Sequence, residues 1–175
     1  LKCTYCYMQP LSGEVMTKDS FRRVLDELTA SEVFMVCVAG GEPFTHPNIC
    51  EYLFELTGAI PQTVVITNGT VMRPQHFDTI KDLMLRGRHL AIQVSLDAVD
   101  PANNRMTRSG TRVILRNLVA LRELGVRLTI AMVVTSRNVG SLLASITKLS
   151  AFTRYFHLMN VQAPRSEPTA VDGLE

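Results

Sequence analysis

Cysteine is scarce in this sequence: four residues in a chain of 175 are too few for the disulfide framework of a small secreted domain. Long apolar runs are also missing, since none approaches the roughly 20 residues that a membrane-spanning helix requires. Neither sign of charge dominates, because 18 basic residues stand against 16 acidic ones. This balance argues against binding to nucleic acid or to a membrane surface.

The residues that are present suffice for one domain, because 46% of the 175 residues are hydrophobic and can bury a sizeable core. Short apolar runs predict strands over residues 33–39, 63–67, 89–97, 126–135 and 155–161. Helical periodicity predicts a helix after an N-cap at Thr17 and further helices over residues 47–58, 74–87, 111–125 and 138–150. Pro47 suits the first helical position of its helix, and residues 99–110 are expected to form a loop.

Regular alternation of helix and strand predicts an α/β fold with a parallel sheet and right-handed crossovers. Five strands are too few for a complete eight-stranded barrel, which takes about 250 residues. Alternation alone leaves two architectures open, a partial barrel and an open doubly wound sheet. In both architectures ligands gather at the carboxyl ends of the strands.

The chain opens with two thiols, Cys3 and Cys6, with Tyr5 directly before the second. Thiolates are soft ligands for iron–sulfur clusters, zinc or copper, and C-x-x-C alone is compatible with a zinc knuckle, a redox dithiol or a cluster loop. Three further motifs each follow an apolar run: Gly40-Gly41-Glu42-Pro43, Thr67-Asn68-Gly69-Thr70 and Ser95-Leu96-Asp97-Ala98.

The order and spacing of these four motifs resemble the radical S-adenosylmethionine superfamily over residues 1–164. The resemblance implies a partial (β/α)6 TIM-like barrel in which three cysteines hold a 4Fe–4S cluster. Cys3 and Cys6 match the last two of these, and the first would fall before Leu1, so we expect the chain to be truncated and to lack the first barrel strand. Residues 1–163 would form the barrel core, and residues 164–175 a flexible tail or the start of a missing C-terminal extension.

The resemblance also assigns residues of the first two motifs to S-adenosylmethionine. Tyr5 would stack on the adenine, and Gly40, Gly41 and Glu42 would meet the methionine amine. A strand end without Cβ atoms lets backbone carbonyls approach such a group closely. The Thr67-Asn68-Gly69 turn would only shape the floor of the site.

Alternation along the strand over residues 89–97 places Gln93, Ser95 and Asp97 on one face and apolar residues on the other. The apolar face would lie under helices, so three polar side chains would point into the barrel, which is costly without partners. The resemblance implies that Ser95 and Asp97 reach the ribose and methionine ends of the cofactor. A buried hydrogen-bond network is the alternative role.

Two arginines follow this strand, and relatives often use an arginine here to bind the cofactor carboxylate. Of Arg105 and Arg108, we take Arg108 as the candidate. On the next strand Ala131 stands where many relatives have a polar residue. Asn138 is expected to cap a helix, and His157 to be a core histidine rather than a substrate contact.

The other two cysteines, Cys37 and Cys50, lie in a strand and a helix of the expected fold. Buried free cysteines usually pack as small hydrophobic residues, and we assign both to packing. None of the four histidines has metal-ligand spacing.

The motifs together predict a radical S-adenosylmethionine enzyme. The resemblance implies that a reduced 4Fe–4S cluster cleaves the cofactor to a 5′-deoxyadenosyl radical, which abstracts hydrogen from the substrate. The opening motif and the Ser-Leu-Asp strand most resemble SPASM-type maturases of peptides or proteins. Cofactor biosynthesis, as by the molybdenum-cofactor cyclase, and a C-x-x-C zinc or redox module are the alternatives.

The expected partners are a peptide or small-molecule substrate and an electron donor such as flavodoxin or ferredoxin. Free thiols and an oxygen-sensitive cluster suit the cytoplasm. Because only two cluster ligands are present, we expect the chain alone to be inactive.

Overall fold

The computed structural model of the chain describes residues 3, 15–105 and 108–160. Its sheet consists of β1 (Met35–Val38), β2 (Gln62–Thr67), β3 (Leu90–Ser95), β4 (Arg127–Val134) and β5 (Phe156–Asn160). All neighbouring strands are parallel, and their order in the sheet follows the chain from β1 to β5. The parallel sheet expected from the sequence is confirmed.

Helices connect the strands. The longer ones are α1 (Lys18–Ala30), which precedes β1, and α2 (Ile49–Ala59), α3 (Pro74–Leu85), α5 (Thr111–Glu123) and α6 (Leu142–Leu149), which join consecutive strands. The shorter ones are η1 (Pro43–Thr45), α4 (Pro101–Arg105) and η2 (Val139–Ser141).

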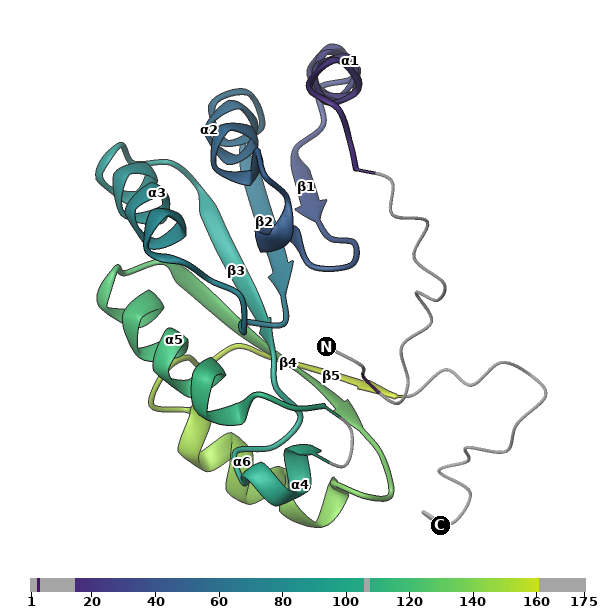
Figure 1. Cartoon of the computed structure of the whole chain (residues 1–175), viewed down its shortest axis with the longest axis vertical. Helices are drawn as coiled ribbons and strands as arrows, with labels where there is room; N and C mark the ends of the chain where they lie inside the picture. Colours follow the sequence, from purple (N-terminus) through teal and green to yellow (C-terminus); the bar gives the residue numbers. More distant parts are fainter. Residues whose placement is uncertain (1–2, 4–14, 106–107, 161–175) are drawn as a thin grey trace, which may run out of the picture.

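The helices lie on one side of the curved sheet, and the opposite face is open (Figure 1). A doubly wound sheet would reverse its strand order and carry helices on both faces. Strands in sequential order with helices on one face form an open half-barrel. Right-handed crossovers between parallel strands produce this arrangement. The partial barrel is therefore confirmed and the doubly wound alternative is excluded.

Two of the sequence predictions about helices are wrong, one helix start and one segment expected to be a loop. Pro47 lies outside α2, because Asn48 is the N-cap of that helix and the separate turn η1 precedes it. Residues 99–110, expected as loop, contain α4. The Asp100 carboxylate accepts a hydrogen bond from the Ala102 N–H at 2.8 Å, and Pro101 occupies the first position. This Asp-Pro start is a helix signal in its own right.

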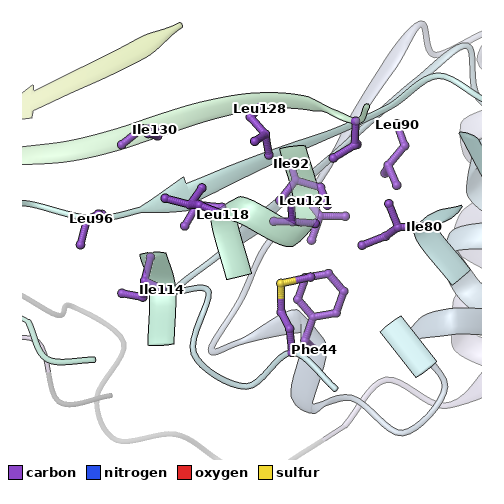
Figure 2. Packing of buried hydrophobic residues seen from close by; sticks show 14 of the residues in the cluster. Phe44, Ile80, Leu90, Ile92, Leu96, Ile114, Leu118, Leu121, Leu128 and Ile130 are labelled. Atoms are coloured by element: carbon purple, nitrogen blue, oxygen red, sulfur yellow. The ribbon is translucent and has the colours of Figure 1, made fainter. Parts of the chain in front are cut away.

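The hydrophobic core lies between the sheet and its helices (Figure 2). The apolar face of β3, Ile92 and Val94, and the following Leu96 are at most 1% exposed. They pack against fully buried side chains of α3 and α5, namely Ile80, Leu83, Ile114 and Leu118. Each such side chain contributes roughly 1.5–3 kcal/mol through burial, so the helix-covered face supplies most of the stability of the fold.

The strand register shows which side chains are neighbours on the open face of the sheet, which we call the concave face. Cys37 of β1 lies beside Val64, Gln93 of β3 lies beside Thr129, and Ala131 lies between Ser95 and His157. We keep this name for the row of positions that these pairs define. Within the part of the chain that the structure describes, no helix covers this face (Figure 1).

The predicted burial of two residues on the concave face is wrong. Cys37 is exposed, because Val36 and Val38 are the β1 residues that pack toward the helices. The nearly continuous apolar run of β1 has no alternation from which its faces could be told apart. His157 is also exposed, on β5 at the end of the sheet. Cys50 packs against the core as predicted.

No helix among the described residues is both long and apolar enough to cross a membrane.

Candidate cofactor site

The three motifs that follow β1, β2 and β3 meet at one edge of the half-barrel. Parallel strands have their carboxyl ends on the same edge, and β1, β2 and β3 are consecutive neighbours in the sheet. The turns that begin at Gly40, Asn68 and Leu96 therefore lie side by side. The structure brings together the motifs that the sequence predicts.

The first turn has an open approach for a ligand. Gly40 has a φ of 145°, a conformation that favours glycine, and a Cβ built there would meet no atom of the described residues within 4 Å. Both Gly40 and Gly41 are exposed. Their backbone carbonyls can therefore approach the ammonium group of a ligand.

The side chain of Glu42 joins this turn to the next one. Its Oε1 accepts from the Thr67 hydroxyl at 2.6 Å, and its Oε2 accepts from the Asn68 N–H at 2.7 Å. Oε1 also accepts from the Phe44 N–H at 3.3 Å, which caps η1. The carboxylate is thus engaged inside the protein, and a ligand amine at this turn would meet backbone groups first.

The Thr67-Asn68-Gly69 turn is fixed by its own hydrogen bonds. Thr67 Oγ1 accepts from the Gly69 N–H at 2.9 Å, and Asn68 Oδ1 accepts from the Thr70 N–H at 2.8 Å. The buried Asn117 of α5, which the sequence analysis missed, donates to the Gly69 carbonyl at 2.8 Å. These contacts support a structural role in the floor of the site.

Asp97 is fully buried between the ends of β3 and β4, at 0% exposure. Its Oδ1 accepts from the Val133 N–H at 3.0 Å, and its Oδ2 faces Arg108 Nε at 3.4 Å. Burying a carboxylate is costly unless it is paired and hydrogen-bonded, and both conditions are met here. The geometry is that of the hydrogen-bond network considered as the alternative role for this residue.

Arg108 is the arginine that the fold brings to the site. Its side chain is 8% exposed, and its NH1 group donates to the Ser95 carbonyl at 3.3 Å. Arg105, at the end of α4, is exposed. The hydroxyl of Ser95 and the amide of Gln93 are half-buried on the concave face and make no hydrogen bond within the described part of the chain.

Asn138 occupies the N-cap position of η2, as the sequence predicts, but its side chain has a different role. It precedes η2 without a capping hydrogen bond, and its Nδ2 donates to the Val133 carbonyl at 2.7 Å. Nδ2 also lies 3.5 Å from the Asp97 carbonyl. The side chain therefore holds the end of β4 against the turn after β3. Neither this role nor that of Asn117 leaves a pattern in the sequence, because single buried asparagines have no fixed spacing.

The expected cluster ligands are only partly within the described residues. Cys3 is described, whereas Cys6 and Tyr5 lie outside the described residues. Within residues 3, 15–105 and 108–160, no group of three or more His, Cys, Asp or Glu side chains could hold a metal ion. Groups that can bind an amine, a carboxylate and a hydroxyl lie at this edge of the half-barrel, namely exposed glycine carbonyls, the Arg108 guanidinium and the Ser95 hydroxyl.

Comparison with known proteins finds relatives with similar sequences. AlbA of Bacillus subtilis (strain 168), an antilisterial bacteriocin subtilosin biosynthesis protein, is 30% identical over 102 residues, which are 57% of this chain and 22% of AlbA. The mycofactocin maturase MftC of Mycobacterium tuberculosis (strain ATCC 25618 / H37Rv) is 28% identical over 150 residues, 81% of this chain and 37% of MftC. The chain thus spans well under half the length of either relative.

Solved structures share the fold. Streptococcus suis SuiB bound to S-adenosylmethionine has a TM-score of 0.77 at 18% identity, covering 94% of this chain and 39% of SuiB. SuiB bound to the precursor peptide SuiA has a TM-score of 0.74 at 18% identity, covering 91% of this chain and 36% of SuiB.

A family model decides between the superfamily and a free-standing C-x-x-C zinc or redox module. The model described as Radical SAM superfamily matches residues 1–146, which include all four motifs. A small zinc or redox module would not account for a match over the half-barrel. The chain therefore belongs to the radical SAM superfamily.

Proposed function

We propose that this chain is the core of an enzyme that binds S-adenosylmethionine at the carboxyl edge of the half-barrel. The supporting observation is the convergence of the Gly40 turn, Ser95 and the buried Arg108 at that edge. In this assignment Gly40, Gly41 and the Glu42 backbone meet the methionine amine, and Arg108 binds the carboxylate. An arginine matches a carboxylate with two parallel hydrogen bonds.

The remaining site residues have supporting roles in the proposal. Ser95 contacts the ribose or methionine end, and Asp97 contributes by holding Arg108 in place. Cys3 and Cys6 are proposed ligands of a 4Fe–4S cluster, and Tyr5 is proposed to stack on the adenine. When bound, the cluster and S-adenosylmethionine supply a 5′-deoxyadenosyl radical that abstracts hydrogen from the substrate.

We propose a peptide or protein as the substrate. The names of AlbA, a bacteriocin biosynthesis protein, and MftC, a maturase, support this class. The concave face of the half-barrel, with Gln93, Thr129 and His157 in its rows, offers polar groups for such a substrate. A flavodoxin or ferredoxin is the proposed electron donor. The free cysteines and the oxygen sensitivity of the cluster favour the cytoplasm.

The proposal is tested with the full-length enzyme, purified and reconstituted without oxygen. Iron and sulfide analysis with ultraviolet–visible spectra measures the cluster, and calorimetry measures S-adenosylmethionine binding. Mass spectrometry then detects 5′-deoxyadenosine and a mass change in peptides encoded beside the enzyme. We expect four irons per cluster-binding motif, saturable cofactor binding and a modified peptide.

Two results would contradict the proposal at different levels. Zinc without iron, together with no cofactor binding, would refute the radical enzyme. Cofactor cleavage that depends on a small molecule and never alters a peptide would refute only the substrate class.

A further inference from the structure

Asn104 lies in α4, outside the sequence motifs, and its side chain is 0% exposed. An amide buried this deeply is costly unless its donors and acceptor are paired. Its Oδ1 accepts from the N–H of Asp97 at 3.2 Å and of Ala98 at 3.3 Å. Its Nδ2 donates to Thr111 Oγ1 at 2.8 Å. These partners fix its orientation, because a flipped amide would point its NH2 group at two N–H donors.

The main chain of the same residue holds Arg108. The Asn104 carbonyl accepts from the Arg108 N–H at 2.6 Å. The Arg108 side chain then returns to β3, where it reaches the Ser95 carbonyl and the Asp97 carboxylate. Asn104 thus contacts both partners of the buried ion pair: the backbone of Asp97 through its side chain, and the backbone of Arg108 through its carbonyl.

Through these hydrogen bonds, Asn104 connects α4 to the edge of the half-barrel. The turn after β3 carries two N–H groups, those of Asp97 and Ala98, that both bind the single oxygen of Asn104. The side chain also reaches Thr111, the first residue of α5. Loss of the side chain would free the turn from α5 and let the ion pair move with it.

We propose that Asn104 is a positioning residue for S-adenosylmethionine binding, holding the turn after β3 so that Arg108 and Ser95 keep the geometry that the cofactor requires. The inference rests on the proposed function, since it assigns a role within the same site. Asn104 is fully buried and its carbonyl accepts from the Arg108 N–H, so its effect on the cofactor would pass through Arg108.

Three variants of the complete enzyme separate the effect of the Asn104 hydrogen bonds from the effect of its side-chain volume. Asn104→Leu removes the amide while keeping a similar volume. Asn104→Asp keeps an oxygen for the N–H groups of Asp97 and Ala98, and the Thr111 hydroxyl can turn to donate to it. The matched control is Asn103→Ala, because the half-buried neighbour Asn103 makes no hydrogen bond with the described residues.

Cofactor affinity is measured by anaerobic calorimetry on the reconstituted enzyme. We expect Asn104→Leu to bind S-adenosylmethionine about ten- to hundredfold more weakly, the range for losing a hydrogen bond to a charged group. Asn104→Asp and Asn103→Ala should bind like the wild type. In cofactor-free enzyme, amide hydrogen exchange over residues 96–99 should accelerate in Asn104→Leu alone.

Wild-type affinity per folded molecule in Asn104→Leu would overturn the inference, even if its melting temperature fell. If that variant does not fold, Thr111→Val carries the test, because it removes only the hydroxyl that accepts from Asn104. Unchanged affinity and unchanged exchange in Thr111→Val would then overturn the inference. A wild-type enzyme that binds no S-adenosylmethionine would instead refute the proposed function, and the inference with it.

Discussion

Asp97 Oδ1 accepts a hydrogen bond from the Val133 N–H over 3.0 Å, so a side chain that follows β3 binds the backbone near the end of β4. The other carboxylate oxygen pairs with Arg108 over 3.4 Å. One buried residue therefore fixes the spacing of two strand ends and the position of the guanidinium between them. A change at Asp97 would therefore be felt both at the two strand ends and at the guanidinium of Arg108.

Replacing Asp97 by alanine should affect both stability and cofactor binding. The Val133 N–H and the buried Arg108 charge would lose their partner, and breaking a buried pair costs about 3–5 kcal/mol. Asp97→Asn should cost less, because its oxygen still accepts from Val133 while its NH2 group cannot pair with Arg108. We expect both variants to weaken S-adenosylmethionine binding by about ten- to hundredfold.

Thermal melts beside calorimetric titrations of the full-length enzyme decide this prediction. Asp78→Ala is the control, because Asp78 is exposed on α3 and makes no hydrogen bond within the described residues. A lower melting temperature with unchanged affinity per folded molecule would make Asp97 a purely structural residue.

Glu42 should prove to be a stability determinant of the first two turns. In Glu42→Gln an NH2 group replaces one oxygen and cannot accept from both Thr67 and Asn68. These contacts are partly buried, so a donor left unpaired there should cost at most roughly 1–3 kcal/mol, measured as a shift of the urea midpoint at constant m-value. The control Glu51→Gln removes an exposed ion pair with Lys18 and should cost less than about 1 kcal/mol. Equal shifts in the two variants would mean that the Glu42 contacts add nothing.

Gly110 should not tolerate a side chain. Its φ is 91°, and a Cβ there would lie 2.7 Å from Thr70 Cγ2. Left-handed backbone costs about 1–2 kcal/mol for an L-residue, and overpacking adds roughly 1–3 kcal/mol. Adding Thr70→Ser removes the clashing methyl and keeps the hydroxyl that donates to Asn68. The double variant should therefore be free of the overpacking cost and retain the backbone cost.

The comparison of urea unfolding free energies in Gly110→Ala, Thr70→Ser and the double variant measures the coupling. Additive effects would show that the two sites do not clash. Gly140→Ala is the control, since a Cβ there would meet no described atom within 4 Å.

The sequence predicts the fold well because the strands differ in pattern from the helices. Ile92 and Val94 alternate with Gln93 and Ser95, so the faces of β3 could be read before the structure was known. The three motifs that follow β1, β2 and β3 could also be placed together from the sequence, because parallel strands end at one edge.

The faces of β1 and the support behind the site could not be read in this way. The uniformly apolar run around Cys37 hides which side meets the helices. Asn104 and Asn138 both contact Asp97, which lies 7 positions before the first and 41 positions before the second. Such contacts depend on how the turns after β3 and β4 meet, which no local pattern encodes.

His76 gives the fold a pH dependence that can be isolated. Its ring is 2% exposed, its Nδ1 accepts from the Arg73 N–H at 3.0 Å, and it packs on Phe44. Burial, and secondly the charge of Arg73, lower the pKa of His76 below its ordinary value of 6.5. The folded protein therefore keeps the ring neutral under conditions in which the unfolded chain already binds a proton.

The unfolded chain binds more protons below about pH 6.5, so the free energy of unfolding should fall as the pH falls through that value toward the folded-state pKa. Above about pH 7.5 the contribution of the neutral ring is fully present. His76→Asn keeps an acceptor for the Arg73 N–H and cannot titrate. The unfolding free energy of this variant should therefore depend less on pH than that of the wild type. Urea unfolding at steps between about pH 5 and 8 measures it, with exposed His89→Asn as the control. Parallel curves for wild type and His76→Asn would show that another group is responsible.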